Sequence, residues 1–367
     1  MPQALPKIAI LGAGLLGRLL AFSLRNDAKI KLFDQDSGDA MQSAAYLAAA
    51  MLAPLAESAE SSQGVMRLGE ASLKLWPKIL EQLPEEVFLQ QNGSLLLAFE
   101  QDLASLTTFQ HNLKDDAYQS VGIDEIRALE PEINQRFHQG LFLPNEGQLD
   151  NRQLLKVLAE ALGNADNITW ITNATTEIAE ASVVVNGKRQ NGFDWIIDCR
   201  GLGAKPNQTD LRGVRGEVIR LYAPQVTLNR PVRLMHPRYP IYIAPKPNHQ
   251  FVVGATQLES EDRRQSTVRS TLELLSACFS VHSGFAEAEI LQNQSGLRPA
   301  YLDNEPQMRI NGNVISLNGM YRHGYLLSPV MVDMCRNYLL GKTINPLYRQ
   351  QLPNILQILT VQMEEFA

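Results

Sequence analysis

The stretch 8–36, IAILGAGLLGRLLAFSLRNDAKIKLFDQD, decides the fold. It opens with an apolar run that predicts a buried parallel strand, and it then passes through the glycine-rich turn 12–17. An apolar helix follows to about Leu24, and a second apolar strand covers 30–33. A glycine-rich turn alone is often only a turn. Strand, turn, helix and second strand in this order predict the start of a nucleotide-binding βαβ unit.

The three glycines of the turn are expected to have separate roles. Gly12 permits the tight turn, Gly14 lets a pyrophosphate approach the backbone, and Gly17 lets helix and strand pack closely. Asp34 ends the second strand, where its carboxylate can accept hydrogen bonds from both ribose hydroxyls and would repel the 2′-phosphate of NADP. The stretch therefore predicts a Rossmann domain that binds FAD or NAD, with the pyrophosphate at the helix N-terminus.

Length and charge limit the other possibilities. A chain of 367 residues is too long for one ordinary core and predicts two domains. The net charge of −6 offers no basic footprint, so nucleic-acid binding is disfavoured. A small anionic substrate stays compatible with this charge because one local arginine can bind it.

Cysteine and histidine usage predicts neither disulfides nor a metal. Cys199, Cys278 and Cys335 are widely spaced, and the six histidines show no metal-ligand spacing, which fits the reducing cytoplasm. The N-terminal sequence lacks the basic and apolar regions of a signal peptide. The apolar stretch 44–56 is too short to span a bilayer, so no transmembrane segment is expected.

The order of patterns predicts a mixed α/β protein. Strand and helix patterns alternate at the start, antiparallel strands are expected between 214 and 253, and a strand and a helix return near the end. A helix over 63–83 is expected to be kinked or split by Pro77, and a strand is expected near 288–291. We therefore expect a nucleotide-binding domain built from separated segments, with a second sheet inserted between them.

Three other features are candidates for the active site. The small-residue run 43–54 fits a close-packed helix and a cofactor wall equally well. Arg298 stands before Pro299, which favours extended backbone, and Arg322 stands near Gly324. Arginine recognises a carboxylate through two parallel N–H bonds, although either arginine alone is more often a surface residue. Tyr242 lies on an alternating strand and could point to either face.

Several motifs in order carry a family resemblance. YIAPK at 242–246, FVVGAT at 251–256, GLRPAYLDNEP at 296–306 and YRHGYLLSP at 321–329 follow the glycine turn. The chain resembles the D-amino-acid oxidase family of flavoproteins and, within it, the glycine oxidases of thiamine biosynthesis. The resemblance implies a glutathione-reductase-type FAD-binding domain and a substrate domain with an antiparallel sheet. The expected FAD-binding segments are 1–90, 140–213 and 292–367, and the expected substrate-binding segments are 91–139 and 214–291.

The resemblance also implies roles for individual residues. Arg298 would anchor a substrate carboxylate, Tyr242 would assist through its hydroxyl, and Arg322 would be a second substrate contact. Backbone N–H groups of the turn 323–325 would face flavin N1 and O2. The implied FAD contacts are Gly12, Gly14, Leu15, Leu16 and Gly17 at the pyrophosphate; Asp34 and Gln35 at the ribose; Thr175 at the adenine, through its backbone; and Ala44, Ala45, Ala49, Ala50, Met51, Met320, Tyr321, His323, Gly324, Tyr325 and Leu326 at the flavin.

The activity implied by the resemblance is oxidation of a small amino acid or amine. A hydride passes from Cα to flavin N5, the imine is hydrolysed, and O2 reoxidises the flavin to give H2O2. Ala50, Lys246, His323 and Tyr325 depart from the family pattern, and the last two bear on pocket size. Two alternatives stay open: a D-amino-acid dehydrogenase that reduces a quinone, and a flavin-binding partner or maturation protein with little turnover. A NAD-dependent dehydrogenase is disfavoured, and a homo-oligomer is left open.

Overall fold

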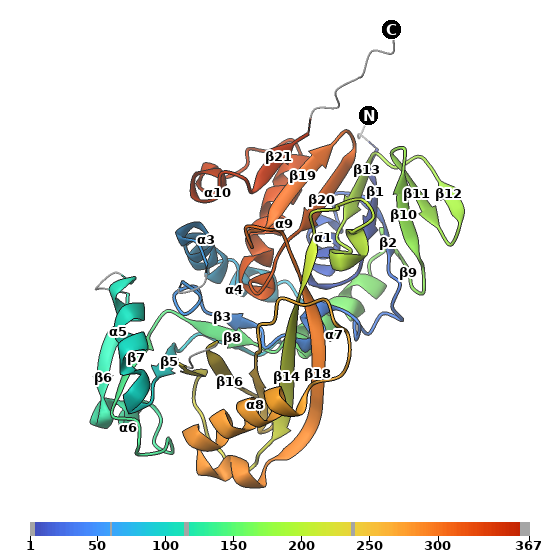
Figure 1. Cartoon of the computed structure of the whole chain (residues 1–367). Helices are drawn as coiled ribbons and strands as arrows, with labels where there is room; N and C mark the ends of the chain where they lie inside the picture. The colour runs from blue at the N-terminus through green and yellow to red at the C-terminus, as the bar shows by residue number, and fades with distance from the viewer. Residues whose placement is uncertain (1–3, 59–60, 114–116, 236–238, 360–367) are drawn as a thin grey trace.

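The computed structural model describes residues 4–58, 61–113, 117–235 and 239–359 (Figure 1). A seven-stranded sheet lies at the top of this view, and all its neighbouring strands pair in parallel except β19 and β20. Its strands in spatial order are β21 (Leu356–Ile358), β19 (Gln307–Asn311), β20 (Val314–Asn318), β13 (Trp195–Asp198), β1 (Lys7–Leu11), β2 (Lys29–Phe33) and β9 (Ile168–Ile171).

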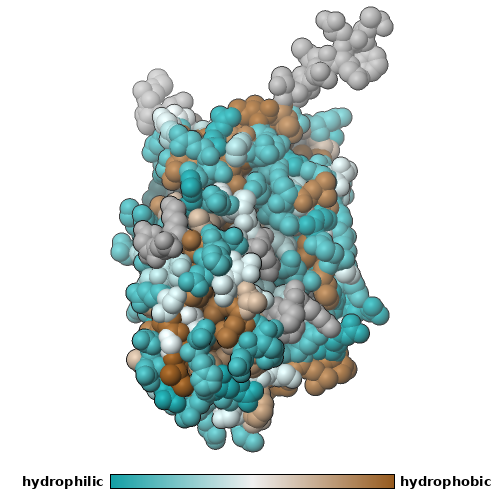
Figure 2. All heavy atoms as spheres, turned by 60° about the vertical axis from the view of Figure 1, so that its left-hand side comes forward, coloured by the Kyte–Doolittle hydropathy of each residue, from teal (hydrophilic) through white to brown (hydrophobic). Residues whose placement is uncertain are grey.

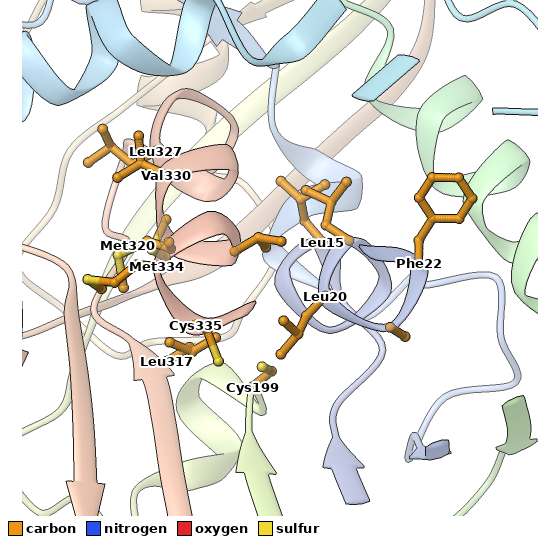
Figure 3. Close-up of a cluster of buried hydrophobic side chains, with 14 of the residues drawn as sticks. Leu15, Leu20, Phe22, Cys199, Leu317, Met320, Leu327, Val330, Met334 and Cys335 are labelled. Carbon is orange, nitrogen blue, oxygen red and sulfur yellow. The ribbon is translucent and has the colours of Figure 1, made fainter. Parts of the chain in front are cut away.

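Both faces of β1 are buried, which explains its unbroken apolar sequence. Ile8 and Ile10 join a core formed with α1 (Leu15–Leu24), α7 (Asn151–Gly163) and α9 (Gly324–Leu339). Figure 3 shows α1 and α9 meeting across this core. On the other face, Ala9 and Leu11 pack against a second sheet. Its strands are β10 (Thr176–Ala179), β11 (Ser182–Val185) and β12 (Lys188–Gln190).

A larger sheet of eight strands forms the lower part of Figure 1. Its neighbours pair antiparallel except β15 and β5. In spatial order its strands are β18 (Glu289–Ala300), β14 (Arg212–Tyr222), β17 (Gln250–Gly254), β16 (Ile241–Lys246), β15 (Val232–Leu234), β5 (Ser94–Leu97), β7 (Gln139–Leu143) and β6 (Gln119–Gly122). The long pair β14 and β18 reaches up toward the seven-stranded sheet.

Short elements complete the fold. A three-stranded sheet of β3 (Met51–Leu52), β8 (Gly147–Leu149) and β4 (Leu89–Gln90) lies between the two large sheets in Figure 1. The remaining helices are α2 (Ala44–Leu47), α3 (Gln63–Leu73), α4 (Trp76–Leu80), α5 (Leu103–His111), α6 (Ile123–Leu129), α8 (Val268–Val281) and α10 (Pro346–Gln351), with 3-10 turns η1 (Glu100–Asp102), η2 (Gly201–Ala204) and η3 (Ser283–Glu287).

The mixed α/β prediction is confirmed, whereas some expected bounds are wrong. The helix expected over 63–83 is split into α3 and α4, which is one of the two outcomes expected at Pro77, and it ends at Leu80 rather than at 83. Pro77 stands in the first turn of α4, where an N–H has no partner within the helix. The strand expected at 288–291 continues to Ala300, because its polar middle pairs along β14. Residues 140–143 and 292–300, expected in the FAD-binding segments, lie in the eight-stranded sheet. The division into two domains stays a proposal.

The surface has no single dominant apolar area in the view of Figure 2. Hydrophobic residues lie there in separate patches among hydrophilic ones. No helix within the described ranges is long and apolar enough to cross a membrane. The three cysteines are buried and free. Among the described residues, no group of three or more His, Cys, Asp or Glu side chains could hold a metal ion.

Candidate active site

The glycine turn has the geometry that its sequence predicts. Gly12 has a φ of +92°, and a Cβ there would lie 2.7 Å from the carbonyl oxygen of Cys199. A Cβ on Gly17 would overlap the carbonyl oxygen of Gly12. Beside Gly14 the nearest atom to a Cβ would be 3.8 Å away, on Ser43, so a ligand can approach its backbone. Gly14 caps α1 without a side-chain hydrogen bond, which leaves the first N–H groups of the helix for an anion.

Asp34 lies beside this turn at the end of β2. Its side chain is largely buried, and burial raises the pKa of the carboxyl group above its usual value. Asp34 Oδ1 accepts a long hydrogen bond of 3.4 Å from the Asp36 N–H. The carboxylate thus retains acceptor capacity for a ligand with hydroxyl groups.

One cavity of about 880 Å³ is lined both by the glycine turn and by residues of the eight-stranded sheet, among them Tyr242 and Arg298. It is lined by every residue that the sequence assigns to cofactor or substrate except Gly17, which lies under the turn. The lining residues named in the sequence analysis are Gly12, Gly14, Leu15, Leu16, Asp34, Gln35, Ala44, Ala45, Ala49, Ala50, Met51, Thr175, Tyr242, Arg298, Met320, Tyr321, Arg322, His323, Gly324, Tyr325 and Leu326.

The small-residue run forms part of the cavity wall and part of the core. Ala49 and Ala50 are almost fully buried and line the cavity, but they lie outside α2, a helix of four residues none of which is buried. The close-packed helix is therefore wrong, and the cofactor wall stays a prediction. Ala50 has a φ of +53°, a conformation that glycine adopts more easily than alanine. The Lys246 ammonium donates to the carbonyl oxygen of Ala49 at 2.8 Å, and the Tyr325 hydroxyl donates to that of Ala45 at 3.1 Å. These bonds fix the wall to β16 and α9.

Two backbone donors assigned from the resemblance are already used. The N–H of Thr175 donates to Asn186 Oδ1 and its carbonyl accepts from the Asn186 N–H, each at 2.9 Å. An adenine contact through that N–H would have to replace a hydrogen bond. The N–H of His323 donates to the carbonyl of Met320 at 2.8 Å. The donors of this turn that are left for a flavin are the first-turn N–H groups of α9, including those of Gly324 and Tyr325.

Tyr242 and Arg298 enter the cavity beside two strand glycines. A Cβ on Gly216 of β14 would overlap the Arg298 guanidinium, and a Cβ on Gly254 of β17 would lie 2.9 Å from the Tyr242 hydroxyl. Arg298 donates to the carbonyls of Arg215 and Thr256, at 3.3 and 3.1 Å. Among the described residues it forms no ion pair. Neither glycine was predicted as a site residue, although a glycine within a strand often marks such a close approach.

Arg322 lies in a different electrostatic setting. Its Nε contacts Glu57 Oε2 at 3.1 Å, and Glu57 Oε1 accepts from Arg233 Nη1 at 3.0 Å. These two cations hold the pKa of the buried Glu57 carboxyl at about 2, despite the opposing effect of burial. Burial also lowers the pKa of His323 to about 4, so its imidazole is neutral at physiological pH. No motif marks Glu57 or Arg233, so neither could be identified from the sequence alone.

Comparison with known proteins identifies the family. The family model described as DAO, FAD dependent oxidoreductase, matches residues 7–334. The chain belongs to this family of FAD-dependent oxidoreductases. Its cofactor is therefore FAD rather than NAD, which the glycine turn alone left open.

Individual relatives of this DAO-family enzyme cover nearly its whole length. A protein of Rhizobium etli, named for thiamine biosynthesis as oxidoreductase ThiO, is 35% identical, over 93% of this chain and 98% of that protein. A glycine oxidase of Bacillus licheniformis is 24% identical, over 91% of this chain and 93% of that protein. The crystal structure of glycine oxidase from Geobacillus kaustophilus matches with a TM-score of 0.80 at 22% identity, over 92% of this chain and 96% of that one. This structural likeness shows a shared fold.

The residues present fit FAD. The open backbone at Gly14 and the uncapped start of α1 suit the pyrophosphate, and Asp34 offers an acceptor for the ribose. The first turn of α9 directs a second set of N–H groups toward the same cavity. The DAO-family cofactor can therefore be held largely by backbone groups.

Proposed function

We propose that this enzyme oxidises a small amino acid or amine that carries a carboxylate. The observation that carries the proposal is Arg298, a guanidinium without a carboxylate partner in the described structure, which lines the same cavity as the glycine turn. A cation in this setting favours an anionic ligand. The names of the ThiO and glycine oxidase relatives support an amino acid as that ligand.

In the proposed reaction the protein binds and orients the substrate. Arg298 on β18 holds the substrate carboxylate, and Tyr242 on β16 of the same sheet adds a hydroxyl donor that lines the same cavity. Burial raises the pKa of Tyr242, so its hydroxyl keeps the proton needed for donation. When bound, FAD would supply the oxidant for removal of the Cα hydrogen as a hydride, with O2 as the final electron acceptor and H2O2 as its product. Water then hydrolyses the product imine to an oxo acid and an amine or ammonia.

The donors beside the cofactor support the same reaction. The N-terminus of α9 provides preorganised N–H groups that favour negative charge at the flavin. The neutral His323 imidazole adds no positive charge there. We therefore assign this turn to cofactor stabilisation and Arg298 to substrate binding. A place in thiamine biosynthesis and a cytoplasmic location are further parts of the proposal, and the former rests on the name of the Rhizobium etli relative.

Anaerobic titration of the holoenzyme tests the proposal. Glycine, N-methylglycine and small D-amino acids are added, and flavin reduction is followed by loss of its visible absorbance. Reduction by at least one of them, with peroxide formed at one equivalent per turnover in air, is the expected result. Reduction without peroxide, but with rapid transfer to a quinone, would favour a dehydrogenase. A flavin that stays oxidised with every compound would overturn the proposal and favour a binding protein.

A further inference from the structure

The two arginines at the substrate end of the cavity differ in their counter-charges. The Arg298 guanidinium donates to two carbonyl oxygens, and no carboxylate of the described structure pairs with it. Carbonyl oxygens orient a guanidinium but do not neutralise its charge. Arg298 is therefore ready to receive one carboxylate from a ligand.

The Arg322 guanidinium is already engaged at each of its three nitrogens. Nη1 donates to Gln257 Oε1 at 2.6 Å, Nη2 donates to Glu57 Oε1 at 3.3 Å, and Nε lies 3.1 Å from Glu57 Oε2. The Glu57 carboxylate thus covers one edge of the guanidinium. A ligand carboxylate that approached this edge would have to displace it.

The Glu57 carboxylate is held in place from its other side. Arg233, on β15, is 5% exposed at its side chain and donates to Glu57 Oε1 at 3.0 Å. The two arginines keep the Glu57 pKa low, so the carboxylate stays ionised at physiological pH. Both Glu57 and Arg322 line the cavity. The cavity wall therefore contains an ionised carboxylate that is already paired with two arginines.

We propose that Glu57 is a specificity residue that limits this enzyme to substrates with a single carboxylate. This inference rests on the proposed function, because it assumes that Arg298 receives the first carboxylate. A second carboxylate that extended toward Arg322 would meet the ionised Glu57, and like charges in a desolvated pocket disfavour binding. A neutral group of the same size meets no such charge. Glu57 therefore selects against dicarboxylates, because it already occupies the Arg322 edge that a second carboxylate would need.

Binding of two matched ligands tests this inference without turnover. Diglycolate carries two carboxylates, and its monoamide has the same size with one carboxylate replaced by a neutral amide. Their Kd values are measured on the FAD-loaded protein by calorimetry and by the shift of the flavin spectrum. We expect the wild-type protein to bind the monoamide at least about tenfold more tightly than diglycolate. Equal binding of the two ligands, or no binding of either, would overturn the inference.

The variant Glu57→Gln removes the charge and keeps the size of the side chain. We expect the preference for the monoamide to disappear, because the ionised carboxylate that a second ligand carboxylate would meet has been removed. An unchanged preference would overturn the inference. Loss of one carboxylate leaves two buried cations unbalanced, so the double variant E57Q/R233M is made in parallel to restore the charge balance. The same change of preference is expected in this variant.

Glu130 provides a matched control. It is fully buried and pairs with Arg230 at 3.0 Å, and it does not line the cavity. The ligand preference of Glu130→Gln is expected to equal that of the wild-type protein. A preference lost equally in Glu130→Gln and Glu57→Gln would overturn the specific role of Glu57. If no amino acid reduces the flavin, the proposed function is contradicted. The effect of Glu57 on ligand binding would still be supported if the ratio of the Kd values of diglycolate and its monoamide depended on the charge of residue 57.

Discussion

The two ends of the cavity are built in different ways. At the dinucleotide end, the glycine turn, the start of α1 and Asp34 come from the continuous stretch 8–36, and backbone groups provide most of the expected contacts. At the substrate end, Glu57, Tyr242, Arg298 and Arg322 come from separate elements, and charged side chains provide the contacts. The cofactor end therefore depends on local conformation, whereas the substrate end depends on the assembly of the whole chain. Variants at the two ends should separate cofactor binding from substrate binding.

The largest effect is expected at Gly17, where a side chain would overlap the Gly12 carbonyl. Gly17→Ala should lower the free energy of unfolding by about 3 kcal/mol or more, because the backbone cannot relax. It should also weaken FAD binding by at least about a hundredfold. Denaturant unfolding and fluorescence titration with FAD measure the two changes. In Gly163→Ala the added Cβ meets no atom within 4 Å. This control should keep its FAD, and equal losses in both variants would contradict the account of the turn.

Arg298→Met should give the opposite pattern, in which substrate binding is lost and cofactor binding is kept. Charged hydrogen bonds of this kind contribute roughly 1.5 to 3 kcal/mol, so KM for an amino acid should rise by roughly 10- to 200-fold. The FAD content should equal that of the wild-type protein. Arg309→Met removes an arginine that pairs with Asp210 away from the cavity, and it serves as the control. A wild-type KM in Arg298→Met would remove the anchor assignment.

Asp34→Asn should weaken the cofactor end alone, by a smaller amount. The amide keeps one acceptor oxygen and loses the charge, so the Kd for FAD should rise by about tenfold. KM for the amino acid, measured at saturating FAD, should not change. A change in KM without a change in FAD affinity would mean that the two ends of the cavity are not separable as described.

Lys246 joins β16 to the wall of the cavity, and its expected effect is on the pH dependence of stability rather than on ligand binding. Its buried ammonium donates to the carbonyls of Ala49 and Leu149 and to Gln148, and burial lowers its pKa to about 7. Between this value and about 10.5 the unfolded chain binds more protons than the folded one, so this group makes stability rise with pH. The slope is at most about 1.4 kcal/mol per pH unit. The free energy of unfolding is measured with denaturant between pH 7 and 10, and its rise with pH should be absent in Lys246→Met. The same pH profile in this variant and in the wild-type protein would contradict the assignment.

The geometry of the glycine turn could be predicted from the sequence because its determinants are local. The roles of Gly12, Gly14 and Gly17 follow from residues that are neighbours in the chain, and the geometry of the turn agrees with them. The substrate end was predicted only through resemblance to a family. Nothing in the sequence around Glu57 indicates that it meets Arg322, because their contact joins two distant parts of the chain.

Hydrogen bonds made by the fold also limited the prediction. The backbone N–H groups of Thr175 and His323 were assigned to FAD, but each already has a partner within the protein. Such bonds depend on turns whose partners are not marked by any motif. Gly216 and Gly254 were missed for a related reason: the side chains that need their space lie on neighbouring strands.

A crystal structure of the holoenzyme with FAD and a bound carboxylate such as diglycolate monoamide tests the central claim most directly. The account predicts that the pyrophosphate lies at Gly14 and the first turn of α1. It also predicts that the ligand carboxylate accepts hydrogen bonds from Arg298 within the same cavity. A carboxylate bound elsewhere, with the Arg298 guanidinium unchanged on its two carbonyl oxygens, would contradict the account.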